Sequence, residues 1–113
     1  MGNLYRFVEP LVLFTLKAKS EAHGYELFRD LERHALTDNA IEHATLYRTL
    51  RQLEENGHVH SRWIDTGSGP ARRVYSLTAA GDQHLREWGA VLSRLASAMT
   101  ELVKEIEQIE ASS

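Results

Sequence analysis

The most regular pattern of hydrophobic positions lies in the last third of the chain. Large apolar side chains recur there at alternating intervals of three and four residues, at Leu85, Trp88, Leu92, Leu95, Met99, Leu102, Ile106 and Ile109. This spacing is the a/d pattern of a coiled-coil helix. We expect a helix over residues 79–110, with Thr78 as its N-cap and a frayed tail at residues 111–113. Such a helix outruns the small domain before it, so the positions from Leu85 to Ile106 are the predicted dimer contacts.

The first predicted helix, residues 4–16, is apolar on nearly every side. Pro10 lies either in its first turn or after a short lead-in. A helix without a polar face is buried on more than one side. We therefore expect one side to face the core of the domain and another to face a second chain.

A second helix is predicted over residues 24–34, after a polar connection at residues 17–23. Its apolar stripe consists of Leu27, Phe28 and Leu31. Residues 37–39 (Thr-Asp-Asn) have the composition of a turn.

The third predicted helix spans residues 44–57. Leu46, Leu50 and Leu53 fall on one face, and Gly57 stands where a left-handed C-cap residue is expected. The other faces carry Thr45, Tyr47, Arg48, Arg51 and Gln52. Tyrosine, arginine and glutamine side chains bind phosphates or base edges, so this is the candidate DNA-reading helix.

A β-hairpin is predicted next, with strands at residues 59–64 and 72–77 and a loop at residues 66–70. The residues that flank its tip include Arg62, Arg72 and Arg73. Helix, polar turn, helix and basic hairpin is the order of a winged helix-turn-helix. We predict a mostly α (α+β) fold in one compact unit: a winged helix-turn-helix DNA-binding domain at residues 1–78 and a C-terminal dimerisation helix at residues 79–113.

The charge distribution changes this picture only modestly. The net charge is −3, but residues 43–77, the third helix and the hairpin, carry five basic and three acidic groups. The only positive segment is therefore the one expected to face phosphates, where local charge matters more than the total. Cysteine is absent, no apolar run is long enough to cross a membrane, and no signal-peptide pattern is present, so we expect a cytoplasmic protein.

Candidate catalytic and metal-binding patterns are weak. The chain has no glycine-rich phosphate loop, nucleophile elbow or distinctive carboxylate pair, so we expect no enzyme and no cofactor. His58 and His60 are two apart on a predicted strand, but a third ligand is not evident, and we expect no metal site. We expect Tyr75 in the core, and Trp63 in the packing of the hairpin.

Four motifs in register resemble the PadR family of bacterial transcriptional regulators. They are His-Gly-Tyr-Glu-Leu at residues 23–27, Thr-Leu-Tyr-Arg-Thr-Leu at residues 45–50 with the later Leu53, Glu54 and Gly57, Gly-Pro-Ala-Arg-Arg-Val-Tyr-Ser-Leu-Thr at residues 69–78, and Gly81. The resemblance covers residues 5–110. It implies a winged-helix dimer on a palindromic operator, usually a repressor, with the C-terminal helix packed on the partner's first helix.

The resemblance carries over Thr45, Tyr47 and Arg48 as DNA contacts by motif. With the tyrosine and arginines proposed from their chemistry and position, the predicted DNA contacts are Tyr25, Thr45, Tyr47, Arg48, Arg51, Arg72 and Arg73. In some members a small hydrophobic effector at the dimer interface releases the DNA, and Trp88 and Phe14 are the candidate aromatic walls. The chain departs from the family at Glu42-His43-Ala44, where members often have a Ser-Pro-Gly-like entry, so contacts just before Thr45 do not carry over.

One alternative belongs to another functional class. A winged helix can keep its fold and dimer while binding protein, and the acidic net charge and Glu42 favour such an interaction module slightly. Salt dependence separates the two, because binding through several phosphate contacts weakens steeply as salt rises.

Overall fold

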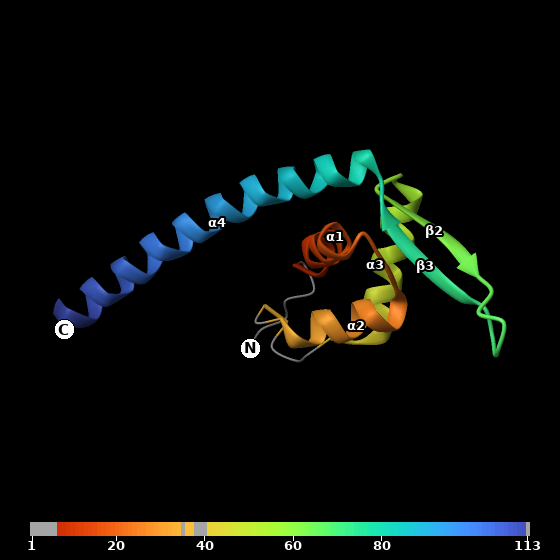
Figure 1. Ribbon diagram of the computed structural model, residues 1–113. Helices are drawn as coiled ribbons and strands as arrows, with labels where there is room; N and C mark the ends of the chain where they lie inside the picture. Colours follow the sequence, from red (N-terminus) through yellow and green to blue (C-terminus); the bar gives the residue numbers. More distant parts are fainter. Residues whose placement is uncertain (1–6, 35, 38–40, 113) are drawn as a thin grey trace.

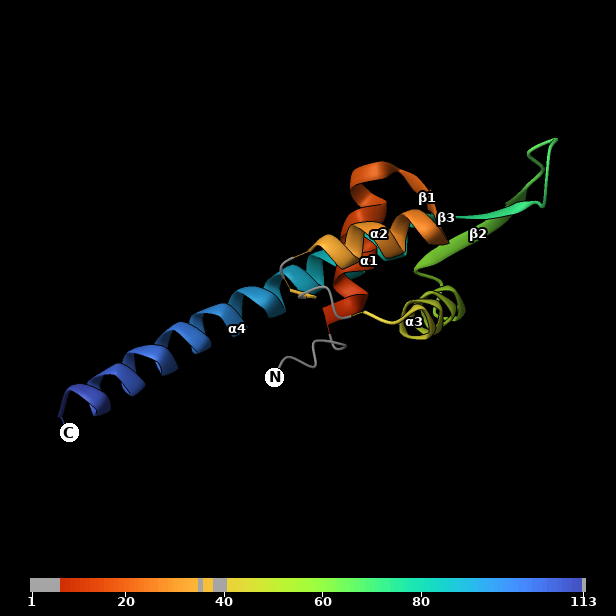
Figure 2. The ribbon, with the colours of Figure 1, turned by 90° about the horizontal axis from the view of Figure 1, so that it is seen from below.

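The computed structural model describes residues 7–34, 36–37 and 41–112. Its elements are α1 (Val8–Lys19), β1 (Glu21–His23), α2 (Gly24–Arg33), α3 (His43–Glu55), β2 (Val59–Ile64), β3 (Arg72–Leu77) and α4 (Ala79–Ser112). Figure 1 shows α1, α2 and α3 packed together beside the β2–β3 hairpin, with α4 leaving this globular part as a long arm. The hairpin tip and the end of α4 point away from each other in both views (Figures 1 and 2), and the molecule is 67 Å long. The predicted mostly α (α+β) winged helix-turn-helix with a long C-terminal helix is confirmed.

Helix α1 is the centre of the core. Val12, Leu13 and Leu16 are fully buried, whereas Phe14 is 55% exposed. Helices α2, α3 and α4 and strand β3 of the same chain all contact α1. Most of this helix is therefore covered by its own chain, and the contact with a second chain stays a prediction for the side that carries Phe14. Pro10 lies in the first turn, where a missing N–H breaks no helical hydrogen bond.

Helices α2 and α3 agree closely with the sequence prediction. In α2, Leu27 and Leu31 are buried and Phe28 packs at the edge of the core. Thr37 donates a hydrogen bond from Oγ1 to the carbonyl of His34 (2.8 Å) just after α2, as expected for the turn, whereas Asp38 and Asn39 lie outside the described residues.

The predicted glycine cap of α3 is confirmed. Gly57 has a φ of +80°, which L-residues with a side chain rarely adopt. Its N–H donates to the carbonyl of Glu54 (3.0 Å), and the N–H of His58 donates to the carbonyl of Leu53 (2.9 Å). These two bonds form a Schellman motif that ends the helix.

The sheet contains one strand more than expected. β2 and β3 have the predicted bounds, but β1 pairs antiparallel with the other edge of β3, giving the order β1-β3-β2. The predicted polar connection at residues 17–23 is therefore wrong, because Lys17–Lys19 extends α1 and Glu21–His23 is a strand. A strand of three residues with a single inward side chain, Ala22, is too short to show an alternating pattern.

Helix α4 begins at the predicted residue. The N–H of Gly81 donates to Thr78 Oγ1 (2.9 Å), which confirms Thr78 as the N-cap. The helix continues to Ser112, so the expected fraying at residues 111–112 is wrong; Ser113 lies outside the described residues. Neither α4 nor any other described helix includes an apolar stretch that could span a membrane.

Candidate nucleic-acid interface

The outer face of α3 presents the residues expected to read DNA. Leu46, Leu50 and Leu53 are buried against the core, which turns the opposite face of the helix outward. The side chains exposed there include Tyr47, Arg48, Arg51 and Gln52. The prediction for Thr45 is wrong, because this residue was expected on the exposed face and is only 9% exposed.

The start of α2 lies directly against α3. A Cβ placed on Gly24 would come within 2.5 Å of the hydroxyl oxygen of Tyr47, so the tyrosine packs over this glycine. Tyr25 follows Gly24, and its ring is exposed with the Arg29 guanidinium 5.8 Å from the ring centre. This packing fixes the position of Tyr47 relative to the first turn of α2.

A groove of about 550 Å³ lies between the start of α2, helix α3 and the hairpin. It is lined by His23, Gly24, Tyr25, Tyr47, Trp63, Arg72, Arg73 and Tyr75. The structure thus brings together four predicted DNA contacts (Tyr25, Tyr47, Arg72 and Arg73), whereas Thr45, Arg48 and Arg51 do not line the groove.

Trp63 is a groove residue that the sequence interpretation assigned to packing within the hairpin. Its ring packs against Arg73 across the hairpin, as expected (5.7 Å from the guanidinium carbon to the ring centre), but it is 66% exposed and so also faces the groove. Trp63 lies on the same face of β2 as the buried Val59, and alternation alone predicts burial for both. Its direct pairing with Arg73 across the hairpin depends on the strand register, which the spacing of residues along the sequence does not give.

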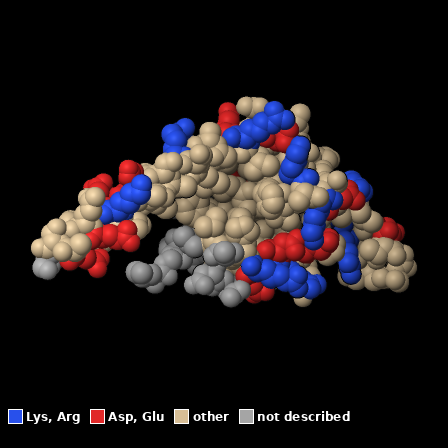
Figure 3. Space-filling model, turned by 60° about the vertical axis from the view of Figure 1, so that its left-hand side comes forward, with Lys and Arg blue, Asp and Glu red and all other residues tan. Residues whose placement is uncertain are grey.

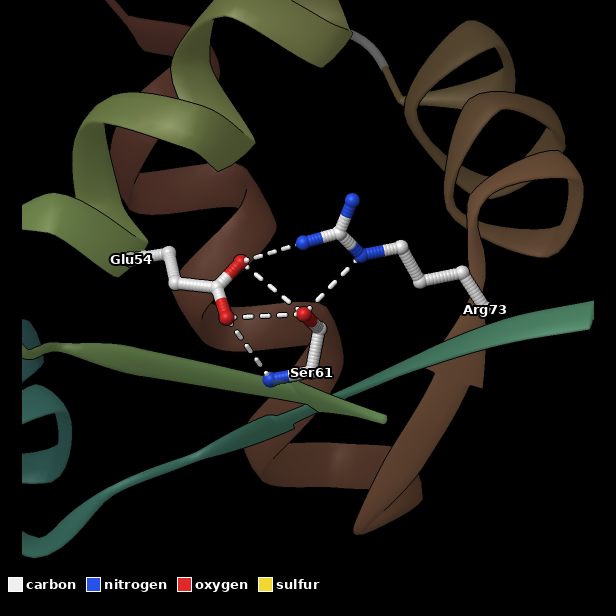
Figure 4. A network of polar contacts seen from close by, with 3 residues as sticks. All are labelled: Glu54, Ser61 and Arg73. Carbon is white, nitrogen blue, oxygen red and sulfur yellow. Dashed lines mark hydrogen bonds and ion pairs between the residues drawn. The ribbon is translucent and has the colours of Figure 1, made fainter. Parts of the chain in front are cut away.

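A polar network joins the hairpin to α3 (Figure 4). Arg73 donates from Nη2 to Glu54 Oε1 (3.1 Å) and from Nε to Ser61 Oγ (2.9 Å). Ser61 also donates to the Glu54 carboxylate, from its backbone N–H (3.1 Å) and from its hydroxyl (2.7 Å to Oε2). The Glu54 carboxylate near the end of α3 is therefore bonded to both strands of the hairpin.

Tyr75 lies under this network, as the sequence interpretation expected of a core residue. The Arg73 guanidinium is 5.7 Å from its ring centre. Burial raises the pKa of the Tyr75 hydroxyl above its ordinary value, and the positive charge of Arg73 opposes that shift.

Positive charge on the interface is limited. Lys and Arg side chains are interspersed with Asp and Glu over the globular end in Figure 3. Arg62 pairs with Glu21 (Nη2 to Oε2, 2.9 Å), and Arg73 pairs with Glu54. Of the arginines predicted to contact DNA, those without an ion pair to a carboxylate of the described residues are Arg48, Arg51 and Arg72. Arg72 lies on the opposite face of β3 from Arg73, with Nη1 3.4 Å from His23 Nε2.

The predicted dimer seam divides into two parts. Leu85 and Trp88 pack against the core of their own chain, and Leu92 and Leu95 are half-buried. The large apolar side chains that follow are mostly exposed: Met99, Leu102, Ile106 and Ile109. The first part of the seam therefore docks α4 on its own domain, and the far part is open.

The two candidate effector residues lie in different pockets. Phe14 lines an apolar pocket of about 250 Å³ together with Leu85, Leu92 and others on α1 and α4. Trp88 lines a second pocket of about 180 Å³, where its indole Nε1 donates to Glu9 Oε1 (3.0 Å). Within one chain, the structure does not bring Phe14 and Trp88 together.

The histidines also differ from expectation. His58 precedes β2, and its ring stacks on His84 of α4 with 4.1 Å between ring centres, so it does not share a strand face with His60. Across the described residues, no group of three His, Cys, Asp or Glu side chains is placed to hold a metal ion.

Comparison with known proteins gives a consistent result. Residues 12–87 match the model of the transcriptional regulator PadR-like family. The chain is similar to the transcriptional regulator Rv3488 of Mycobacterium tuberculosis, at 41% identity over 81 residues that cover 70% of each protein. It is also similar to a PadR family transcriptional regulator from Eggerthella lenta, with a TM-score of 0.70, 34% identity and coverage of 88% of this chain and 85% of that one.

A third similar structure is Bacillus subtilis PadR in complex with operator DNA. The TM-score is 0.64 at 25% identity, and the match covers 74% of this chain and 46% of that chain. The Bacillus subtilis protein is described as a negative transcriptional regulator, and its sequence is 26% identical over 73 residues, which are 40% of its length.

Proposed function

The chain belongs to the PadR-like family of transcriptional regulators, as its motifs indicated, and from this premise we propose that it binds operator DNA as a homodimer and represses transcription. Proteins of this family are regulators and not enzymes. The proposed mechanism places α3 in the major groove of a half-site and the β2–β3 hairpin against the backbone or minor groove.

The observation that carries this proposal is the outer face of α3. Arg48 and Arg51 are exposed there and form no ion pair with the described carboxylates, so their charges are available for phosphates or for guanine edges. Tyr47 of the same helix and Tyr25 line the adjacent groove, and their hydroxyl groups are suited to donate to phosphate oxygens. The structure of the Bacillus subtilis relative with operator DNA supports the same use of this fold.

The far half of α4 supports the homodimer. Met99, Leu102, Ile106 and Ile109 form an exposed apolar stripe, and burial of such a stripe against a second copy is favourable at about 25 cal/mol per Å². Exposed Phe14 and the pocket it lines beside α4 extend this apolar surface. A dimer with twofold symmetry would read a palindromic operator, with half-site spacing set by α4.

A small hydrophobic effector is the proposed means of release. The pocket beside Phe14 is mainly lined by apolar side chains of α1 and α4, the elements that would set the angle between the two reading helices. A ligand that changes this angle lowers DNA affinity, and by linkage DNA lowers ligand affinity by the same factor.

The protein-interaction alternative has one observation in its favour. Arg62 and Arg73 of the hairpin are paired with Glu21 and Glu54, which reduces the positive charge offered to DNA. An adaptor that binds protein through apolar contacts would depend little on salt.

The test is binding of the purified protein to its own upstream intergenic DNA, followed by fluorescence anisotropy at two salt concentrations. We expect tight binding that resists unrelated competitor DNA and weakens steeply as salt rises. Weak binding without sequence preference at both salt concentrations would overturn DNA regulation and favour the interaction module.

A further inference from the structure

The aromatic side chain that projects from the hairpin has no partner in the core. Trp63 is 66% exposed, and it lies on the rim of the groove that also holds Tyr25 and Tyr47. Single exposed aromatic residues are common on proteins. Here, however, three exposed aromatic side chains from β2, α2 and α3 converge on one groove together with two arginines.

The Trp63 ring is held in place by Arg73. The two residues are directly opposite in the β2–β3 register, and the guanidinium carbon of Arg73 is 5.7 Å from the centre of the Trp63 ring. That distance is within the range of a cation–π contact. Arg73 itself is bonded to Ser61 and to Glu54, so a continuous set of contacts runs from the last turns of α3 to the indole.

This arrangement gives Arg73 a different role from Arg72. The Glu54 carboxylate balances the charge of Arg73, whereas Arg72, on the other face of β3, lies beside His23 and forms no ion pair with a carboxylate of the described residues. A guanidinium that is bonded to a carboxylate and covered by an indole is suited to fix geometry rather than to bind a phosphate.

We propose that Trp63 is a DNA-contacting residue, and that Glu54, Ser61 and Arg73 are positioning residues that hold its indole at a fixed place relative to the reading helix. The inference rests on the proposed DNA-binding function. The apolar ring would pack on deoxyribose at the edge of the half-site, and the indole N–H would donate to a phosphate oxygen.

The chain contains two tryptophans, so a Trp88→Phe variant leaves Trp63 as the sole indole reporter. We would titrate this variant with upstream duplex DNA and follow tryptophan emission and acrylamide quenching, while labelled-DNA anisotropy records binding independently. We expect Trp63 to be shielded on binding, with acrylamide quenching reduced and a midpoint equal to that of the anisotropy curve, because a contact residue loses its exposure to solvent. The Trp63→Phe variant, which reports Trp88, is the matched control.

Affinity provides the second measurement. Trp63→Ala should weaken binding about tenfold, which is the usual scale for one well-packed contact, with an unchanged melting temperature. Glu54→Gln should weaken binding in the parent protein but have little further effect in the Trp63→Ala background, because Glu54 acts through the indole. A merely structural role of Glu54 would lower affinity equally in both backgrounds.

Two results would overturn the inference. If anisotropy records tight, specific binding while Trp63 remains as accessible as in free protein and Trp63→Ala binds normally, Trp63 is not a contact and the proposed function stands. If the parent protein binds no upstream DNA, the proposed function fails and the inference fails with it.

Discussion

At Gly81, the first turn of α4 passes over the backbone that leaves α3. Thr78 donates from Oγ1 to the carbonyl of Gly57 (2.7 Å), and its N–H donates to the carbonyl of His58 (3.1 Å). A Cβ on Gly81 would lie 2.0 Å from the His58 carbonyl oxygen. This close approach joins the proposed dimerisation helix to the backbone just after the proposed reading helix α3.

Gly81→Ala should therefore destabilise the protein, because backbone at both ends of the contact must shift. Overpacking of this kind typically costs about 1–3 kcal/mol of unfolding free energy. The matched control is Gly89→Ala, also in α4, where an added Cβ has nothing within 4 Å. We expect the control to gain about 0.5–1 kcal/mol from helix propensity. Chemical denaturation measures both, and equal effects from the two variants would contradict the close approach.

Arg48 provides the residue-scale test of the interface. Arg48→Ala should lower DNA affinity about tenfold and reduce its salt dependence, without a change in melting temperature, because the side chain is exposed. Arg94→Ala removes the same charge from an exposed position on α4 and should leave affinity nearly unchanged. Fluorescence anisotropy with a labelled duplex measures the DNA affinity of both variants. If Arg48→Ala binds as tightly as the parent protein, Arg48 does not contact DNA.

The sequence predicted individual positions well where spacing alone decides burial. Leu46, Leu50 and Leu53 recur on one helical face and are buried as expected. Thr45 and Trp63 could not be predicted, because their exposure depends on where the core ends and not on periodicity. Thr45 lies inside that boundary, and Trp63 lies beyond it on a face that is buried at Val59.

At the scale of elements, the long periodic segments could be predicted from the sequence, but the way in which they pack against one another could not. Both hairpin strands and α2, α3 and α4 were identified, with bounds within about two residues. The apolar character of α1 was correctly taken to mean burial on several sides. The sequence could not say that α4 of the same chain would cover α1, because that depends on how α4 crosses it.

The contact between α1 and α4 predicts a pH dependence of stability. Lys17 Nζ is 3.0 Å from Asp82 Oδ1, and the hydrogen bond from Lys17 lowers the pKa of Asp82 below its ordinary value of 3.8, helped by the nearby charge of Arg86. A carboxyl whose pKa is lower in the folded state stabilises the protein above its unfolded pKa, and this stabilisation is lost as pH falls through the folded pKa.

Asp82→Asn should accordingly have a lower melting temperature than the parent at neutral pH. The difference should shrink below about pH 3.8, where the parent carboxyl also becomes neutral. The effect should be small, because the pair is exposed to solvent. Glu101→Gln, an exposed neutralisation further along α4, is the control. A melting difference for Asp82→Asn that stays constant from pH 7 to the acid limit would exclude the charged pair as its cause.

The molecule consists of a globular part and a long helical arm, and the single chain leaves the apolar side chains of that arm uncovered. The globular part uses Leu85 and Trp88 to dock the start of α4, and the remaining apolar positions continue along an arm that the chain leaves uncovered. In the proposed dimer one heptad pattern therefore serves two purposes, since its first part positions the arm and its far part contacts the second copy. Sequence periodicity cannot separate these uses, because the spacing is continuous.

The far half of α4 allows the dimer to be tested without disturbing the protomer. Leu102 is 56% exposed in the single chain, so Leu102→Glu should leave the fold of the protomer intact. In the dimer the new carboxylate would be buried in the seam between the helices, which should cost about 3–5 kcal/mol of association free energy. We expect light scattering at micromolar concentration to show a mass near that of the 12.8 kDa chain. Ser97→Glu adds the same charge on the side of α4 away from the seam and should remain dimeric.

The same variant separates assembly from recognition. A Leu102→Glu monomer keeps Arg48 and the groove residues, so it should bind a single half-site with the affinity of one parental reading helix and lose the added affinity of two linked sites on a full operator. A Leu102→Glu protein that remains dimeric would show that the far seam is not the dimer contact. A monomer that binds the full operator as tightly as the parent would show that the dimer is not needed for recognition, and α4 would then require another explanation for its uncovered apolar stripe.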